Sequence, residues 1–501
     1  MNHVAPLPGT KRACVIGAGL GGLATAIRLQ AAGVATVLVE ARDRPGGRAA
    51  DEERDGFRFD GGPGVLNDRA ALEALWALTG DDLSDAVTLL PVEPLCRYAW
   101  PDGTIFDLHA DDGALTREIA RIAPGDLAGY EDYARFTREM LAEFRTRPGP
   151  APFSAFAALA RAAPQLARHQ AWRSLWSVIA RSVKSEHLRE ALAVPALIGG
   201  ANPFAASALL AAEHARERSG GLWWPEGGMG RLAQALQTRF ERLGGTVRLH
   251  DPAARIHTLG NRAHAVETQS GWNDRFDAVA SSADLVHTWR DLLGDAPRGI
   301  EMARKTRRRA HAPGLFTVSF ALEGAWPGIP HRMVLLGPRF RGLVEDIYAH
   351  GVLPQDQMIW LDHPSLTDPS LAPPGKSLFH AAVPVAHLGK LPIDWETVGP
   401  MLEQRVLDEI GRRLVPDIHD RVITRFHTTP RDLALDFNAS LGSGFGLDPG
   451  PLATGWLRPA TRDARIGNLY LTGSCAMPGG GLPGALASAE ICARTMLENL
   501  P

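Results

Sequence analysis

The chain has 501 residues, of which 45% are hydrophobic and 22% are charged, and its formal net charge is -3. These values are ordinary for a packed globular protein, and the length corresponds to about three average domains. The near-neutral charge argues against a general nucleic-acid binder, because such proteins need a strongly basic face. The four cysteines lie far apart and form no CxxC pair, so we expect neither a disulfide framework nor a metal site.

The N-terminal residues contain no apolar signal segment, and no run of about 18 apolar residues occurs along the chain. On these grounds we expect a cytoplasmic protein without a membrane-spanning helix.

The hydrophobic pattern predicts an α/β chain. The first 50 residues alternate between a buried strand, a glycine turn, a helix and a second buried strand. Further helices are predicted at residues 70–80, 114–146 and 394–414, and further strands at 246–249, 315–322, 377–385 and 469–472, with a hairpin around 100–103 and a last helix from 485. The two ends of the chain therefore look like parts of one nucleotide-binding domain with other segments between them.

The turn after the first strand carries the strongest local signal, a GxGxxG pattern at residues 17–22. Gly17 allows the tight turn, Gly19 lets the backbone approach a pyrophosphate, and Gly22 lets the helix pack closely on the strand. Glu40 ends the next strand, 21 residues after Gly19, which is the spacing of a ribose-binding acid. This pattern predicts a dinucleotide site but does not separate NAD from FAD.

Two more glycine-rich segments extend this signal. Ala41 and Arg42 follow Glu40 and lead to the sequence Gly46-Gly47-Arg48, which offers backbone donors and a fixed positive charge. A close-approach turn containing Gly62 and Pro63 comes next. Near the C-terminus, a strand enters Gly473-Ser474, and the later Gly481-Leu482-Pro483 precedes a helix whose N-terminus would favour negative charge.

These motifs resemble those of the bacterial phytoene desaturases, the carotenoid desaturase family of FAD-dependent oxidoreductases within the amine-oxidase-like superfamily. The resemblance extends over nearly the whole chain. It includes VIGAGLGGLATAIRLQAAG (15–33), VEARDRPGGR (39–48), LWALTG (75–80), WPDG (100–103), IGGANPF (198–204), GGLWWPEGGMGRLAQAL (220–236), HPSLTDPSLAPPG (363–375) and PGGGLPG (478–484).

The resemblance implies a Rossmann-type FAD-binding domain, a mixed-sheet substrate domain and a helical insertion that associates with a membrane. The FAD-binding domain would comprise residues 1–110, 222–300 and 455–501, the insertion residues 111–221, and the substrate domain residues 301–454.

Together the motifs and the resemblance assign FAD contacts to Gly17, Gly19, Leu20, Gly22, Glu40, Ala41, Arg42, Gly47, Arg48, Gly62, Pro63, Ala253, Gly473, Ser474, Gly481, Leu482 and Pro483. Two of these positions depart from the superfamily pattern. Ser474 stands where many members have an acid that binds the flavin's sugar chain, and Ala253 stands where valine is frequent.

The resemblance also implies a reaction, the removal of hydrogen from a C40 polyene precursor such as phytoene to give carotenes of the neurosporene or lycopene type. A hydride would pass to the flavin and a proton would leave the neighbouring carbon, and oxygen or a quinone would be the electron acceptor. Such a substrate predicts a long apolar tunnel. No general base is identified; Asp362, His363 and Asp368 are weak candidates that could equally be turn or capping residues.

Two other functions stay open. The first is another carotenoid flavoenzyme, such as a hydroxyneurosporene-type desaturase, a ketolase or an isomerase. The second is a non-enzymatic carrier of prenyl lipids, because the same fold resembles Rab GDP-dissociation inhibitors. The intact glycine motif, Glu40 and Gly47-Arg48 argue against the carrier.

Residues 151–184 contain arginines and one lysine but no acidic residue. On a helical wheel one face collects Trp172, Leu175, Trp176, Ile179 and Val183, and the opposite face collects Arg173, Arg181 and Lys184. This pattern is typical of a helix lying on an anionic membrane, but equally of a helix packed on the protein's own core. Given a lipid-soluble substrate, we expect a protein peripheral to the inner membrane.

Overall fold

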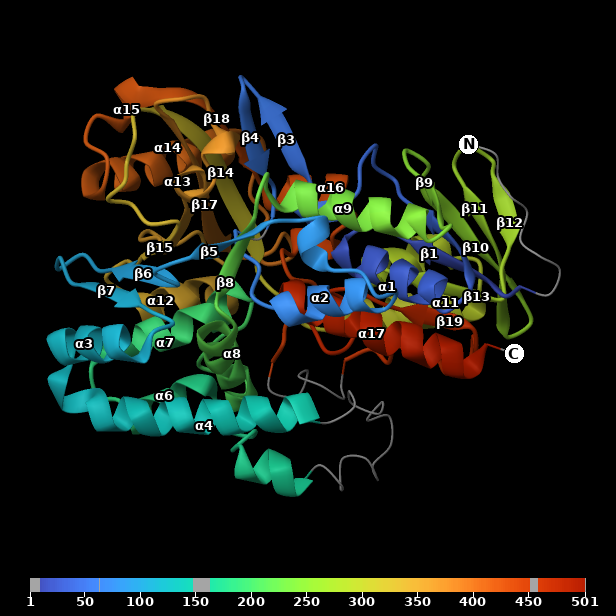
Figure 1. Cartoon of the computed structure of the whole chain (residues 1–501), viewed down its shortest axis with the longest axis horizontal. Coiled ribbons are helices and arrows are strands. Elements are labelled where there is room, and N and C mark those ends of the chain that lie inside the picture. Colours follow the sequence, from blue (N-terminus) through green and yellow to red (C-terminus); the bar gives the residue numbers. More distant parts are fainter. Residues whose placement is uncertain (1–9, 63, 147–162, 451–457, 501) are drawn as a thin grey trace.

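A computed structural model gives the fold of the chain and describes residues 10–62, 64–146, 163–450 and 458–500. Two sheets form its two halves, and a group of helices lies beside them (Figure 1). The first half is built around a parallel sheet of five strands in the order β19-β13-β1-β2-β9. These strands are β1 (Arg12–Ile16), β2 (Ala35–Val39), β9 (Thr246–Arg248), β13 (Ala278–Ser281) and β19 (Leu469–Leu471).

Each face of this sheet is buried by a different layer. Ala13 and Val15 of β1 face the helices α1 (Leu20–Ala31), α9 (Met229–Arg242) and α17 (Gly481–Asn499), and α2 (Arg69–Ala77) joins the same core. Cys14 and Ile16 point the other way, because side chains alternate along a strand. That second face packs on an antiparallel sheet and two helices, which are β10 (Ala253–Leu259), β11 (Arg262–Thr268), β12 (Asn273–Arg275), α10 (Leu285–His287) and α11 (Pro297–Arg307).

The second half is a mixed sheet of seven strands in the order β18-β14-β17-β16-β15-β6-β7. All neighbours are antiparallel except β15 and β6, which are parallel. The strands are β6 (Cys96–Ala99), β7 (Ile105–Leu108), β14 (Gly314–Glu323), β15 (Arg332–Leu335), β16 (Ile359–Asp362), β17 (Lys376–Val385) and β18 (Val422–Thr428). One face of this sheet is apolar and packs on α14 (Trp395–Arg413).

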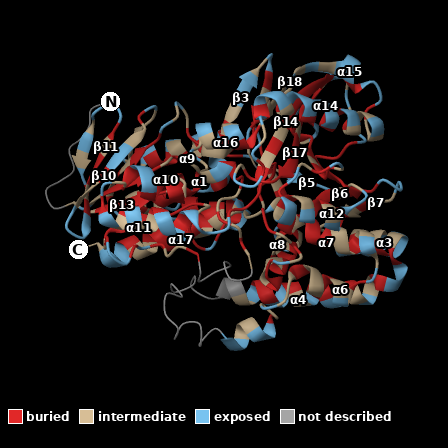
Figure 2. Cartoon of the chain, turned by 180° about the vertical axis from the view of Figure 1, so that it is seen from behind, coloured by how far each residue is buried: buried red, intermediate tan, exposed pale blue. Residues whose placement is uncertain are grey.

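Helices α3 (Asp112–Ile122), α4 (Leu127–Thr146), α6 (Leu175–Ser182), α7 (Glu186–Ile198) and α8 (Ala212–Gly220) form the helical group (Figure 1). Buried residues run through both sheets and the inner faces of these helices (Figure 2). The remaining elements are short: β3 (Asp51–Arg54), β4 (Phe57–Asp60), β5 (Leu89–Val92), β8 (Leu222–Pro225), α12 (Phe340–Glu345), α13 (Pro364–Thr367), α15 (Ile418–Arg421) and α16 (Pro430–Asp436).

The structure confirms the α/β class and the predicted strand–helix–strand unit, and it changes three details. The single helix expected at residues 114–146 is two helices, because Pro124 begins a separate turn between them. The last helix begins at Gly481 rather than at 485. Strands β6 and β7, which the sequence placed in the FAD-binding segment 1–110, pair with the seven-stranded sheet instead. The other domain boundaries proposed from the sequence stay a prediction.

The predicted membrane face of residues 172–183 needs a correction. Ser174 caps α6, which begins at Leu175, so Trp172 precedes the helix. Leu175, Ile179 and Val183 are buried in the protein core, whereas the Trp172 side chain is 66% exposed. Most of the apolar stripe therefore packs on the protein itself, including Trp176, which is partly buried against Phe204 and Phe340, whereas Trp172 is largely exposed.

None of the helices in the described residues combines the length and the apolar character needed to cross a membrane.

Candidate functional site

A cavity of about 2190 Å³ is lined by residues of both sheets and of the helical group. Typical small-molecule pockets have about 300–1,000 Å³, so this cavity has room for two large ligands at once. Its walls include the loops that follow β1, β2 and β19, which meet because parallel strands end at one edge of their sheet.

The glycine turn after β1 forms one end of the cavity. Gly17 has a φ of +95°, and its N–H donates to the Val39 carbonyl at 2.7 Å. A Cβ on Gly22 would lie 1.9 Å from the Gly17 carbonyl oxygen, whereas a Cβ on Gly19 would meet nothing within 4 Å. Gly22 therefore serves close packing of α1, and Gly19 leaves open space on the cavity side.

Glu40 holds the neighbouring loop with its carboxylate. Its side chain accepts hydrogen bonds from the Ala18 N–H at 2.6 Å and from the Arg42 N–H at 2.9 Å. Glu40 is buried, and Ala41 and Arg42 lie beside it on the cavity wall. The acid thus joins the ends of β1 and β2 at the position where the sequence predicted a ribose contact.

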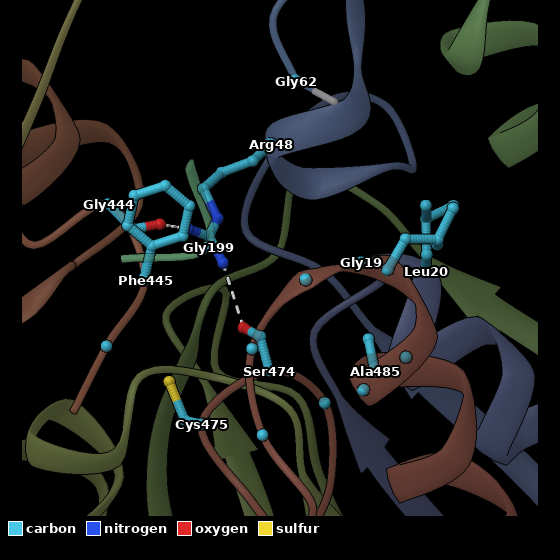
Figure 3. A pocket seen from close by; sticks show the side chains of 18 of the residues that line it. Gly19, Leu20, Arg48, Gly62, Gly199, Gly444, Phe445, Ser474, Cys475 and Ala485 are labelled. Carbon is cyan, nitrogen blue, oxygen red and sulfur yellow. Dashed lines mark hydrogen bonds between the residues drawn. The ribbon is translucent and has the colours of Figure 1, made fainter. Parts of the chain in front are cut away.

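Arg48 links three distant segments (Figure 3). One guanidinium nitrogen donates to the Gly444 carbonyl and the other donates to the Ser474 hydroxyl at 3.0 Å. Gly62 packs directly on this segment, since a Cβ there would lie 2.4 Å from the Arg48 carbonyl oxygen. Arg48 therefore fixes the glycine loop against the turn after β19.

The structure brings most of the predicted cofactor residues together. Those that line the cavity are Gly17, Gly19, Leu20, Glu40, Ala41, Arg42, Gly47, Arg48, Gly62, Ala253, Gly473, Ser474, Gly481, Leu482 and Pro483. Gly22 lies beneath the wall, and Pro63 lies outside the described residues. Gly481, Leu482 and Pro483 form the first turn of α17, whose start therefore lies at the cavity wall and has no side-chain cap.

Sequence reasoning missed Asp60, which precedes the Gly61-Gly62 turn. Its Oδ1 accepts from the Gly230 N–H at 3.1 Å at the start of α9, and its Oδ2 is buried without a partner in the described residues. Burial raises the pKa of Asp60 to about 7. The acid just before a close-approach turn was a signal that could have found it.

The helical group contributes a mainly apolar part of the lining, although Glu213, Arg216 and Glu217 of α8 also line the cavity. It includes Leu166, Trp172, Ile198, Leu209, Leu210 and Ala212. This part agrees with the tunnel expected for a hydrocarbon chain.

The seven-stranded sheet contributes a polar wall instead, which the sequence did not predict. In the strand register, Arg332 lies opposite Asp362, Asp362 opposite His380, and His380 opposite Ser319. We call these four residues the polar row. Residues opposite each other share a face of the sheet, and all four line the cavity. Register could not be read from the separate strand sequences, so no local signal revealed the row.

The three candidate bases have different surroundings. Asp362 lines the cavity, accepts from the Trp360 indole N–H at 3.1 Å, and has a pKa that burial raises to about 7. His363 stacks on Phe379 at 4.2 Å, and its Nδ1 lies 2.9 Å from the Ile329 carbonyl oxygen. Asp368 accepts from the Gly227 N–H at 2.6 Å. Neither His363 nor Asp368 lines the cavity, so only Asp362 remains a candidate.

Comparison with known proteins identifies the family to which the chain belongs. Residues 20–497 match the family of flavin containing amine oxidoreductases. The chain is 41% identical over 493 residues to a lycopene-forming phytoene desaturase of Paracoccus sp. (strain N81106 / MBIC 01143), with 98% of each chain covered. It is also 41% identical over 490 residues to a lycopene-forming phytoene desaturase of Pantoea ananas, covering 98% of this chain and 100% of that one.

Among solved structures, cyclohexylamine oxidase from Brevibacterium oxydans IH-35A matches with a TM-score of 0.63 and 19% identity, covering 98% of this chain and 99% of that chain. This likeness shows the shared fold. The chain therefore belongs to the phytoene desaturases within the flavin-containing amine oxidoreductase family, and it is an FAD-dependent oxidoreductase.

Proposed function

We propose that this enzyme desaturates phytoene to lycopene in carotenoid biosynthesis. The similarity over the full chain to two lycopene-forming desaturases supports this reaction. The cavity supports it physically, because its lining contains both the dinucleotide motif and a group of apolar residues from the helical group. The cavity also has room for a cofactor and a long polyene together.

The residues of the glycine loops fit FAD. Gly19 leaves open space beside the free N–H groups at the start of α1, where a pyrophosphate would bind. Arg48 lines the same cavity and carries a fixed positive charge that can balance phosphate charge, and Asp60 lines the cavity beside the Gly61-Gly62 turn. We therefore propose that the predicted cofactor residues hold FAD, with Asp60 added to them.

We predict that Gly19→Ala weakens FAD binding without destabilising the fold. The new Cβ meets no protein atom within 4 Å, so it intrudes only on the space of the ligand. The dissociation constant for FAD should rise at least about tenfold, or about 1.4 kcal/mol, in an equilibrium titration of apoprotein. The melting temperature of the apoprotein should stay unchanged.

Gly328→Ala is the matched control, because a Cβ there also meets nothing within 4 Å and Gly328 does not line the cavity. Equal FAD affinity of Gly19→Ala and Gly328→Ala would contradict the placement of the pyrophosphate.

Bound FAD supplies the acceptor for the hydride that desaturation removes. A proton must then leave the neighbouring carbon as the double bond forms. We propose that the Asp362 carboxylate takes this proton. Its Oδ2 has no hydrogen-bond partner among the described residues, and a pKa of about 7 suits proton transfer near neutral pH.

Asp362→Asn should lower kcat for phytoene by about 10²-fold or more. Asp362 is ionised above its raised pKa of about 7, so kcat of the wild type should rise between pH 6 and 8 and this rise should be absent from the variant. The measurement is phytoene turnover by FAD-loaded enzyme in liposomes at several pH values.

Glu190→Gln is the control, because burial also raises the pKa of Glu190 to about 7, although Glu190 does not line the cavity. It should keep the rise in kcat. A rise that persists in Asp362→Asn would rule out Asp362 as the proton acceptor.

The overall proposal is tested by pigment analysis. Enzyme loaded with FAD and supplied with phytoene in liposomes should consume phytoene and accumulate lycopene when oxygen or a quinone is present. Accumulation of neurosporene would correct the product. Turnover of an oxygenated carotene but not of phytoene would favour the other carotenoid flavoenzymes, and failure to bind FAD would favour the lipid carrier.

We propose that a membrane contacts the cavity mouth near Trp172. This side chain is 66% exposed and also lines the cavity, and Arg168, four residues earlier in the chain, is exposed as well. Exposed tryptophan and arginine are the side chains that favour an anionic lipid interface. A mouth placed there would let a lipid-soluble substrate enter without crossing water.

Trp172→Glu should reduce co-sedimentation with anionic liposomes about tenfold. The variant loses an indole that would insert into the lipid layer, and it gains a negative charge that the anionic lipids repel. Leu259→Glu is the control: Leu259 is 70% exposed but lies in the β10–β11 hairpin, away from the cavity. If both variants bind liposomes as the wild type does, the membrane contact lies elsewhere.

A further inference from the structure

Arg458 is a buried cation in the cavity wall that the dinucleotide motif did not predict. It is 6% exposed and lines the cavity. The chain just before β19 runs antiparallel to that strand, with Arg462 paired to Tyr470. Continuing this register puts position 458 beside position 474, and the Arg458 Nη1 donates to the Ser474 carbonyl at 3.4 Å. Strand pairing thus carries the guanidinium to the cavity end of β19.

The positive charge of Arg458 is not neutralised by a neighbouring carboxylate. Among the described residues the Ser474 carbonyl is its one hydrogen-bond acceptor, and no acid forms an ion pair with it. Its Nε and Nη2 have no such partner, yet neither atom is fully buried. Burial lowers the pKa of Arg458, but an arginine stays protonated near neutral pH. A charged group with two free donors therefore faces the cavity.

The start of α17 lies beside this guanidinium. A Cβ on Gly479 would lie 3.0 Å from the Arg458 Cζ, so the guanidinium packs on the backbone just before Gly480, the first cap residue of the helix. The helix has 19 residues, no side chain caps its start, and its first turn contains no acid. Its first N–H groups and the positive end of its dipole are therefore available to a ligand. Two positive features meet at one part of the cavity wall.

The strand order indicates which half of FAD would lie there. The proposed pyrophosphate site follows β1, and Glu40, at the predicted ribose contact, follows β2. The adenosine half therefore lies on the β2 side of β1. Strands β13 and β19 lie on the opposite side of β1. The flavin half would extend toward that side, to Arg458 and the start of α17.

We propose that Arg458, together with the start of α17, binds the edge of the isoalloxazine ring formed by N1 and the C2 carbonyl. The proposal rests on the proposed placement of FAD and adds Arg458 to it. When a flavin accepts a hydride, negative charge appears at this edge, so a fixed cation there favours the reduced form over the oxidised form. A higher reduction potential suits an enzyme that removes hydride from a hydrocarbon, which has no lone pair to assist the transfer.

The test is the reduction potential of the bound flavin, measured in FAD-loaded enzyme by equilibration with a dye of known potential. Arg458→Met should make the ratio of the affinities for reduced and oxidised FAD about tenfold smaller, which lowers the potential by about 30 mV for a two-electron couple. Arg458→Lys keeps the charge and should retain most of the wild-type potential. If the methionine variant does not fold, Arg458→Gln carries the same expectation as Arg458→Met.

Arg28→Met is the matched control. The Arg28 side chain is 14% exposed, and its Nε is buried without a partner among the described residues, but it does not line the cavity. Its replacement should leave the potential unchanged. A wild-type potential in the uncharged Arg458 variants would overturn the proposal, even if their melting temperature falls, because Arg458 would then serve the fold alone.

A role of Arg458 at the pyrophosphate would give a different result. The uncharged variants would then bind oxidised FAD at least about tenfold more weakly while the potential stayed unchanged, and this outcome would also overturn the proposal. Failure of the FAD placement is recognised separately, because Gly19→Ala would then bind FAD as tightly as Gly328→Ala. Failure of the proposed desaturation leaves the measurement intact, since the potential is determined without a carotenoid.

Discussion

The close contact between the start of α1 and the turn after β19 is the constraint on which the site depends. A Cβ on Gly21 would lie 2.7 Å from the Gly473 Cα, so only glycine lets these backbones meet. Behind them, the hydroxyls of Thr25 and Thr472 lie 2.8 Å apart although 447 residues separate them. The two ends of the chain thus close one nucleotide-binding edge, and every segment between them has to leave from that edge and return to it.

This constraint explains why one arginine can organise so much of the cavity. Once the turn after β19 is held beside the glycine loop, Arg48 reaches the Ser474 hydroxyl and the Gly444 carbonyl together. Gly444 belongs to the chain that leaves the seven-stranded sheet region, so the same side chain connects the glycine loops to that half of the molecule. At position 474 the serine hydroxyl accepts the hydrogen bond from Arg48 that a carboxylate could also accept.

Motifs formed by residues close together in the sequence could be predicted, but contacts between distant segments could not. The glycine motif and Glu40 could be interpreted from sequence because turn, helix start and strand end lie within 24 residues. The sequence left open whether the face containing Leu175 and Ile179 meets a membrane or the protein core, since a helical wheel shows that a stripe is apolar but not what covers it; the structure places both residues in the core. For His363 and Asp368 the sequence left a structural role open beside a catalytic one, because a motif does not state which way its side chains point; in the structure neither lines the cavity, and Asp368 caps a turn. The polar row could not be found at all, because strand register depends on the whole sheet.

The helical wall and the sheet wall of the cavity therefore offer a ligand different kinds of contact. The apolar helices can hold any long polyene, because the hydrophobic effect is non-directional and scales with the area buried. The row from Arg332 to Ser319 is directional, since a hydrogen bond needs a partner at one distance and angle. The helical wall therefore offers a ligand apolar area without a preferred position, whereas the polar row offers hydrogen-bonding groups at fixed places along the sheet.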